Sequence, residues 1–123
     1  MAACGPQTAA GRVEAGPQFW RPPTSKDTWR IAGYLDTRRV RSGFFSRPEH
    51  EVVVTVNEQV VAHADMPRNA PVELQGRAEG ANVSALCTPQ MVARATLRVT
   101  CLVMVANERA ATLSLVAGTR PPG

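Results

Sequence analysis

Apolar and polar residues alternate along residues 50–117 in three successive strand–turn–strand patterns. Side chains alternate between the two faces of a strand, so paired strands must place their apolar residues on the same face if that face is buried. This requirement predicts a three-residue loop at 57–59, a two-residue turn at Glu79-Gly80 and a three-residue loop at 107–109. Glycine can take positive φ in such a tight turn. The pattern therefore predicts six antiparallel strands in meander order.

The predicted buried face consists of alternate apolar residues in each hairpin. In the first hairpin these residues are Val52, Val54, Val56, Val60, Ala62, Ala64 and Met66. Every proline of the chain falls outside the six predicted strands, where a missing backbone N–H does no harm to a sheet. Gly76 interrupts the apolar pattern inside a predicted strand, which indicates a bulge or the close approach of another backbone.

The segment before residue 50 predicts a fourth hairpin. A turn at Asp36-Thr37 would place one alternating run opposite another, and these runs are Trp29, Ile31, Gly33 and Leu35 against Val40, Ser42 and Phe44. A short helix within residues 24–41 is the alternative, because arginine and alanine favour helices. The predicted fold class is all-β, with an antiparallel meander of six to eight strands that forms a small sandwich or barrel.

Composition divides the chain into one domain and two tails. Residues 1–26 contain four prolines and three glycines, which is typical of a flexible tail. Residues 118–123 are predicted to be a disordered end. Residues 27–117 then form a single β domain. Its core is rich in alanine and valine, and a core of this size is only marginally stable without further support.

Two cysteines fall on the predicted buried face. The matching of strands makes Cys87 and Cys101 cross-strand neighbours. A disulfide between them would stabilise the domain by about 3 kcal/mol in the chain-entropy model and would indicate an oxidising compartment. A pair of reduced, buried thiols is the alternative. The chain has no Cys-x-x-Cys motif and no cysteine–histidine cluster, so no zinc site is predicted.

The opening residues Met1-Ala2-Ala3-Cys4-Gly5 resemble the end of a bacterial lipobox, in which small residues precede a cysteine that becomes lipidated. A Pro/Gly-rich tether before a compact β domain is also similar to a bacterial lipoprotein. The resemblance covers five residues, has methionine where leucine is usual, and has no charged or apolar leader before it. It implies lipidation at Cys4 and a periplasmic or outer-membrane-anchored location. A cytoplasmic location is the alternative.

The positive charge of the chain is concentrated before residue 50. Residues 1–49 contain eight Lys/Arg and four Asp/Glu, whereas residues 50–123 contain six of each. The excess is centred on arginines interleaved with phenylalanines: Arg38, Arg39, Arg41, Phe44, Phe45 and Arg47. Such a segment can follow a phosphate backbone and stack on bases. A solvated basic loop is the alternative, since no nucleic-acid-binding motif accompanies it.

A second candidate surface lies on the face opposite the cysteines. Leu86 is predicted to lie across from Leu102, and Met104, Val116, Val53 and Val61 share their side. A sheet face in water should be more polar than this. We expect the N-terminal segment with Trp29, Tyr34, Phe44 and Phe45, a second sheet layer, or a partner chain to cover it.

Candidate catalytic residues are few. His63, Asp65 and Glu51 are predicted to meet on the polar face of the first hairpin, with His50 at the end of the strand. An imidazole and carboxylates can bind a cation or act as acid and base. A solvated strand face also explains the cluster, and the chain has no Gly-x-Ser-x-Gly motif, P-loop or dinucleotide fingerprint. The sequence therefore predicts no enzyme, no metal site and no cofactor.

Together these features predict a non-enzymatic interaction or structural module of the bacterial cell envelope. We expect it to bind a protein partner or another copy of itself through the apolar patch or a sheet edge. A small nucleic-acid-binding β-barrel that uses residues 38–47 is the first alternative, and a small-ligand-binding barrel is the second. Membrane contact is expected only through a lipid anchor at Cys4, because no segment approaches the ~20 apolar residues of a membrane span.

Overall fold

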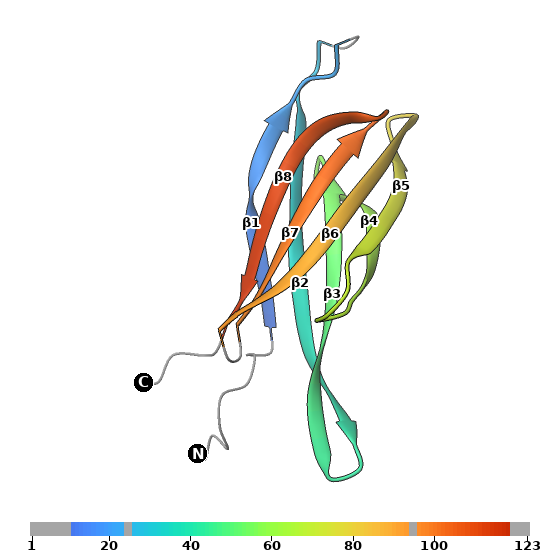
Figure 1. Ribbon diagram of the computed structural model, residues 1–123. Coiled ribbons are helices and arrows are strands. Elements are labelled where there is room, and N and C mark those ends of the chain that lie inside the picture. Colours follow the sequence, from blue (N-terminus) through green and yellow to red (C-terminus); the bar gives the residue numbers. More distant parts are fainter. Residues whose placement is uncertain (1–10, 24–25, 94–95, 119–123) are drawn as a thin grey trace.

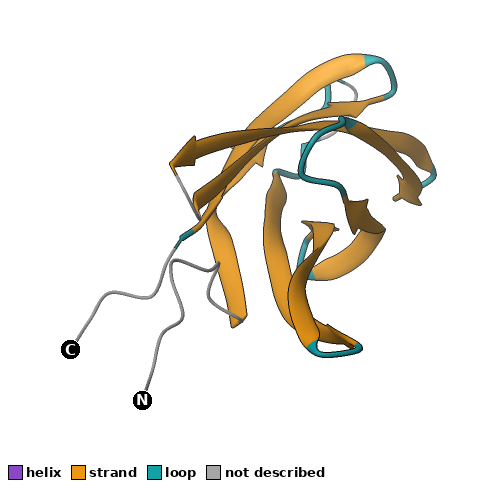
Figure 2. Ribbon diagram, turned by 60° about the horizontal axis from the view of Figure 1, so that its bottom comes forward, coloured by secondary structure: helices purple, strands orange, loops and turns teal. Residues whose placement is uncertain are grey.

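The computed structural model describes residues 11–23, 26–93 and 96–118, which form two four-stranded antiparallel sheets (Figure 1). The first sheet has the order β1 (Gly11–Trp20), β2 (Trp29–Ser42), β3 (Phe45–Val56) and β4 (Gln59–Met66). The second has the order β5 (Val72–Ala78), β6 (Ala81–Ala93), β7 (Thr96–Val105) and β8 (Glu108–Ala117). Figure 2 shows the sheets as two facing layers. The predicted all-β antiparallel meander is confirmed as a sandwich, and the sheets do not close into a barrel.

Two of the predicted hairpins have shorter turns than expected. The central residues Asn57–Glu58 and Ala106–Asn107 all have positive φ, as in two-residue type I′ turns. A β-bulge in each hairpin then restores the register, because the pairing skips Val61 in β4 and Ala110 in β8. Val60 is consequently exposed and not in the core as predicted, whereas Ala62 and Met66 are buried as predicted. Val61, predicted on the outer face, packs against the core.

The β5–β6 hairpin has the predicted two-residue turn at Glu79–Gly80, where both residues have positive φ. Within β5, a Cβ atom on Gly76 would overlap the carbonyl oxygen of Val61 in β4. Gly76 therefore marks a close approach of another backbone, one of the two explanations that the sequence suggested. It lies where the second sheet meets the edge of the first.

The N-terminal half differs most from the prediction. β2 continues through Asp36 and Thr37, where a turn was predicted, and the chain turns instead at Gly43-Phe44, so that β2 pairs with β3. The rival helix is absent from the described residues of this segment. β1 lies inside the predicted flexible tail, so that prediction is wrong for residues 11–20. Of the remaining predicted tails, residues 1–10, 24–25 and 119–123 lie outside the described residues, and residues 21–23 and 26 belong to the connection between β1 and β2.

Three prolines lie inside strands, contrary to prediction, and each has a strand neighbour on one side only. Pro17 lies at the bulge of the edge strand β1. Pro48 lies in β3 beyond its last pair with β4, and Pro89 lies in β6 beyond its last pair with β5. These are edge or bulge positions, where proline is tolerated because no neighbouring strand requires its N–H.

The core lies between the two sheets and consists mainly of valine, leucine and alanine. Its largest fully buried side chains include Ile31, Leu35, Leu74, Leu97, Leu113 and Leu115. A disulfide joins Cys87 of β6 to Cys101 of β7, with an S–S distance of 2.09 Å, and both residues are fully buried. The predicted cross-strand pairing of these residues is confirmed. Cys4, the candidate lipidation residue, lies outside the described residues.

Candidate functional site

β2 and β3 extend beyond the rest of the first sheet as a two-stranded ribbon, which we call the arm (residues 38–49; Figure 1, bottom). β1 pairs with β2 only as far as Thr37, and β4 pairs with β3 only from His50 onward. Within the part of the chain that the structure describes, the arm therefore has no strand neighbour on either edge. The basic segment predicted from the sequence coincides with this projecting element.

The arm is strongly basic. Four arginines and one glutamate give it a formal net charge of 4 − 1 = +3. Glu49 lies 3.3 Å from Arg47 and 3.7 Å from Arg38, yet these two arginine side chains remain 69% and 76% exposed. Ion pairs at such exposure contribute little to stability. By strand alternation, Arg39 and Arg41 lie on the opposite face of the ribbon from Arg38 and Arg47, so both faces carry positive charge.

The tip of the arm carries an aromatic side chain in full contact with solvent. Phe44 is 100% exposed in the turn, and the preceding Gly43 has a φ of +64°. Phe45 is the first residue of β3, and its side chain lies outside what the structure describes. A fully exposed phenylalanine beside arginines contributes nothing to the core. It is the residue type that interfaces use as an anchor.

Thr37 and His50 are paired in the register and lie where the arm joins the rest of the first sheet. Thr37 Oγ1 and His50 Nδ1 are hydrogen-bonded at 2.8 Å, and both residues are almost completely buried. His50 Nε2 is also buried, with no hydrogen-bond partner among the described residues. Burial, and then the positive charge of Arg68, lower the pKa of His50 below its usual value. The sequence placed His50 at a strand end, and its burial could have been read from its shared parity with Val52.

The opposite end of the sandwich contains a cleft of about 810 Å³, which we call the end cleft. The rings of Trp20 and Trp29 meet there edge to face, with centroids 5.5 Å apart. The lining residues come from four separate connections between strands and from the strand ends beside them, and they include Pro22, Pro23, Asp27, Asn57, Glu79, Ala106 and Glu108. Sequence reasoning missed this cleft because no single segment contains it.

The predicted apolar patch lies on the outer face of the second sheet. Leu86 pairs with Leu102 across β6 and β7, and Leu86 is 47% exposed, whereas Leu102 and Met104 are half-buried. The first sheet packs against the other face, which carries the cysteines. The prediction that Trp29 and Tyr34 cover this patch is therefore wrong. Trp29 lies in the core, and Tyr34 lies on the outer face of the first sheet. Val53 and Val61, predicted in the same patch, belong to the first sheet.

The edges of the sandwich are less open than the sequence suggested. At the corner between β1 and β8, the Gln18 side chain accepts a hydrogen bond from Thr112 N–H (3.1 Å) and donates one to the Thr112 carbonyl. At the other corner, the backbone of β4 at Val61 lies against β5 at Gly76. Among the described residues, the arm differs from these corners because neither of its edges has a strand neighbour.

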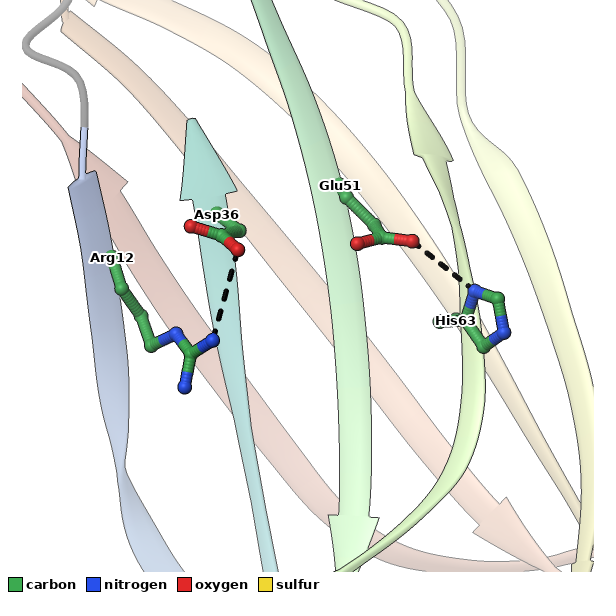
Figure 3. A network of polar contacts seen from close by, with 4 residues as sticks. All are labelled: Arg12, Asp36, Glu51 and His63. Atoms are coloured by element: carbon green, nitrogen blue, oxygen red, sulfur yellow. Dashed lines mark hydrogen bonds and ion pairs between the residues drawn. The ribbon is translucent and has the colours of Figure 1, made fainter. Parts of the chain in front are cut away.

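His63 and the nearby carboxylates lie on the outer face of the first sheet (Figure 3). His63 Nδ1 is 3.2 Å from Glu51 Oε2, and both side chains are well exposed. Asp65 pairs with Glu51 in the register, as predicted. The neighbouring ion pair between Arg12 and Asp36 spans 3.7 Å. The described residues contain no group of three or more His, Cys, Asp or Glu that could hold a metal ion.

Comparison of the chain with known protein families, curated proteins and solved structures found no match. The described residues include no helix long and apolar enough to cross a membrane. The basis for a functional proposal is therefore the geometry of two surfaces, the arm and the end cleft, together with the buried disulfide.

Proposed function

We propose that the protein is a non-enzymatic binding module whose docking element is the arm. The observation that carries this proposal is that residues 38–49 project beyond both neighbouring strands with a net charge of +3 and a fully exposed Phe44 at the tip. Among the side chains that the structure describes, none of the buried core residues belongs to the arm. A two-stranded ribbon is only marginally stable by itself, so its presence is better explained by contact with a partner than by folding.

A protein partner suits the arm better than a nucleic acid. The fully buried Cys87–Cys101 disulfide is compatible with an oxidising compartment such as the bacterial cell envelope, where the usual partners are proteins. The net positive charge of the arm favours acidic groups on that partner, and Phe44 favours an apolar or aromatic pocket. The open edges of the arm add unpaired backbone groups, to which an extended segment can bind.

A small nucleic-acid-binding protein remains the second candidate, for one specific reason. A two-stranded β-ribbon fits the major groove of B-DNA, and the arm carries arginines on both of its faces. This candidate predicts affinity for duplex DNA that falls steeply with salt concentration.

The test is a variant in which residues 39–48 are replaced by Asn-Gly. Arg38 and Glu49 are paired in the register, so a two-residue turn can join them and leave both sheets intact. Wild-type and shortened proteins are compared by affinity capture from envelope extracts, and by fluorescence anisotropy with a short labelled duplex. We expect proteins that the wild type retains and the shortened variant loses. The same set of proteins on both variants would contradict the proposal, and arm-dependent, salt-sensitive duplex binding would favour the second candidate.

A further inference from the structure

The end cleft has the chemistry to receive a cationic, aromatic element. Its charged lining residues are all acidic, namely Asp27, Glu79 and Glu108. Asp27 also has an interaction partner within the chain, so Glu79 and Glu108 carry the argument. Its volume of about 810 Å³ lies within the range of pockets that enclose several groups of a ligand.

Two arginines on strands close to the cleft, Arg30 and Arg77, are already engaged. Arg30 forms an ion pair with Glu58 at 2.8 Å, and Arg77 donates a hydrogen bond to the Gly80 carbonyl at 3.1 Å. Neither residue belongs to the lining. Among the residues that the structure describes, the lining of the cleft supplies carboxylates and no positive charge.

The two tryptophans add selectivity for the groups that the arm displays. A guanidinium is attracted to the face of an indole ring, and a phenylalanine ring packs edge to face against it. The arm presents Arg41 close to its tip and Phe44 in its turn. The same chain thus carries a basic, aromatic projection and an acidic, aromatic cleft.

The arm cannot enter the cleft of its own molecule. β2 begins at Trp29 in the cleft and ends at Ser42 next to the tip. A strand of this length separates the two sites by roughly 40 Å at 3.3 Å per residue. The two sites therefore lie at opposite ends of the molecule, and any contact between them must join two copies.

We propose that the arm of one molecule docks into the end cleft of a second copy, so that the protein assembles head to tail. This inference rests on the proposed docking function of the arm and names its partner. The contact joins two different surfaces of identical chains, so it is heterologous and repeats from copy to copy. Because Trp20 and Trp29 are the only tryptophans in the sequence and both line the cleft, tryptophan fluorescence reports on the cleft.

The test uses two variants that each break one half of the contact. The arm variant carries Arg41→Glu and Phe44→Ser, and the cleft variant carries Glu79→Arg and Glu108→Arg. In sedimentation velocity, we expect the average mass of the wild-type species to increase with protein concentration. Each variant should have a dissociation constant for self-association that is about tenfold higher or more. An equimolar mixture of the variants should form a discrete dimer, because it retains one working arm and one working cleft. Tryptophan emission should change on mixing and saturate at equal concentrations.

Two single substitutions on the outer face of the second sheet control for charge. Arg98→Glu and Glu73→Arg make the same kinds of charge change at exposed positions away from both sites, and they should associate like the wild type. A wild type that stays monomeric at every concentration would overturn the inference, as would variants that fail to complement each other while the wild type associates. Arm-dependent capture of other proteins by a monomeric wild type would refute only the second copy as partner and would leave the proposed function standing.

Discussion

Gly76 is a residue whose missing side chain allows the two sheets to meet. A Cβ at this position would overlap the carbonyl oxygen of Val61, and this backbone cannot move without disturbing β4. Gly76→Ala should therefore lower the free energy of unfolding by about 2 kcal/mol or more, measured by urea denaturation. Gly16→Ala is the matched control, because its Cβ would meet no atom within 4 Å. Equal losses at both positions would show that the close approach is not the cause.

His50 should make stability depend on pH. Burial lowers its pKa in the folded protein below the ordinary value of 6.5. Below that value the unfolded chain binds a proton that the folded protein does not, so the free energy of unfolding is highest above pH 6.5 and falls as pH decreases toward the folded pKa. Urea denaturation from about pH 8 to about pH 5 should show this fall, and His50→Leu should reduce it.

The control for this prediction is His63→Gln. His63 is exposed on the outer face of the first sheet, so its replacement should leave most of the pH dependence in place. His50→Leu itself lowers stability at every pH, because it leaves the buried Thr37 hydroxyl without its partner. The informative quantity is therefore the change in the free energy of unfolding per pH unit. An unchanged slope in His50→Leu would contradict the assignment.

Among the strands, alternation in the sequence predicted those that have one regular buried face. It predicted the pairing of β6 with β7, including Cys87 opposite Cys101. It did not predict the bulges, because a two-residue turn with one extra residue and a three-residue loop give the same parity beyond them. β1 escaped prediction because it is an exposed edge strand with Pro17 at its bulge.

The candidate site was predictable in composition but not in shape. The arginines and phenylalanines of residues 38–47 were recognisable as a basic, aromatic segment. Their projection depends on where the described pairing of β1 with β2 and of β4 with β3 stops, at Thr37 and at His50. This depends on three strand pairings together, which alternation within one segment does not show. The polar residues between Asp36 and Arg41 also have the composition of a turn, so a turn was predicted inside β2 and this strand was predicted too short.

The arm should be dispensable for folding. None of its described side chains belongs to the core, and the ion pairs of Glu49 with Arg38 and Arg47 are exposed. Replacing residues 39–48 by Asn-Gly should therefore change the free energy of unfolding by less than about 1 kcal/mol. Circular dichroism and urea denaturation measure this directly. A loss of several kcal/mol would mean that the arm stabilises the sandwich, and it would weaken the case that the arm exists to bind a partner.

At the scale of the whole molecule, the disulfide makes the stability of the fold depend on an oxidising compartment. It links the two central strands of the second sheet inside a core of small side chains, so its loss removes a constraint that packing does not replace. The unfolding free energy of the fully reduced protein should be lower by about 3 kcal/mol, measured by urea denaturation with and without reductant. Because both sulfurs are buried, reduction under native conditions should be slow and should follow the rate of unfolding.

Non-reducing mass spectrometry of protein purified from its own cells tests the compartment separately. An exported protein should be two hydrogens lighter than its reduced form, because Cys87 and Cys101 are linked. Protein from the cytoplasm of the same cells, made without export, supplies the comparison. Two free thiols in the natively located protein would remove the argument for an oxidising compartment. The preference for a protein over a nucleic acid as the partner of the arm would lose its main support with it.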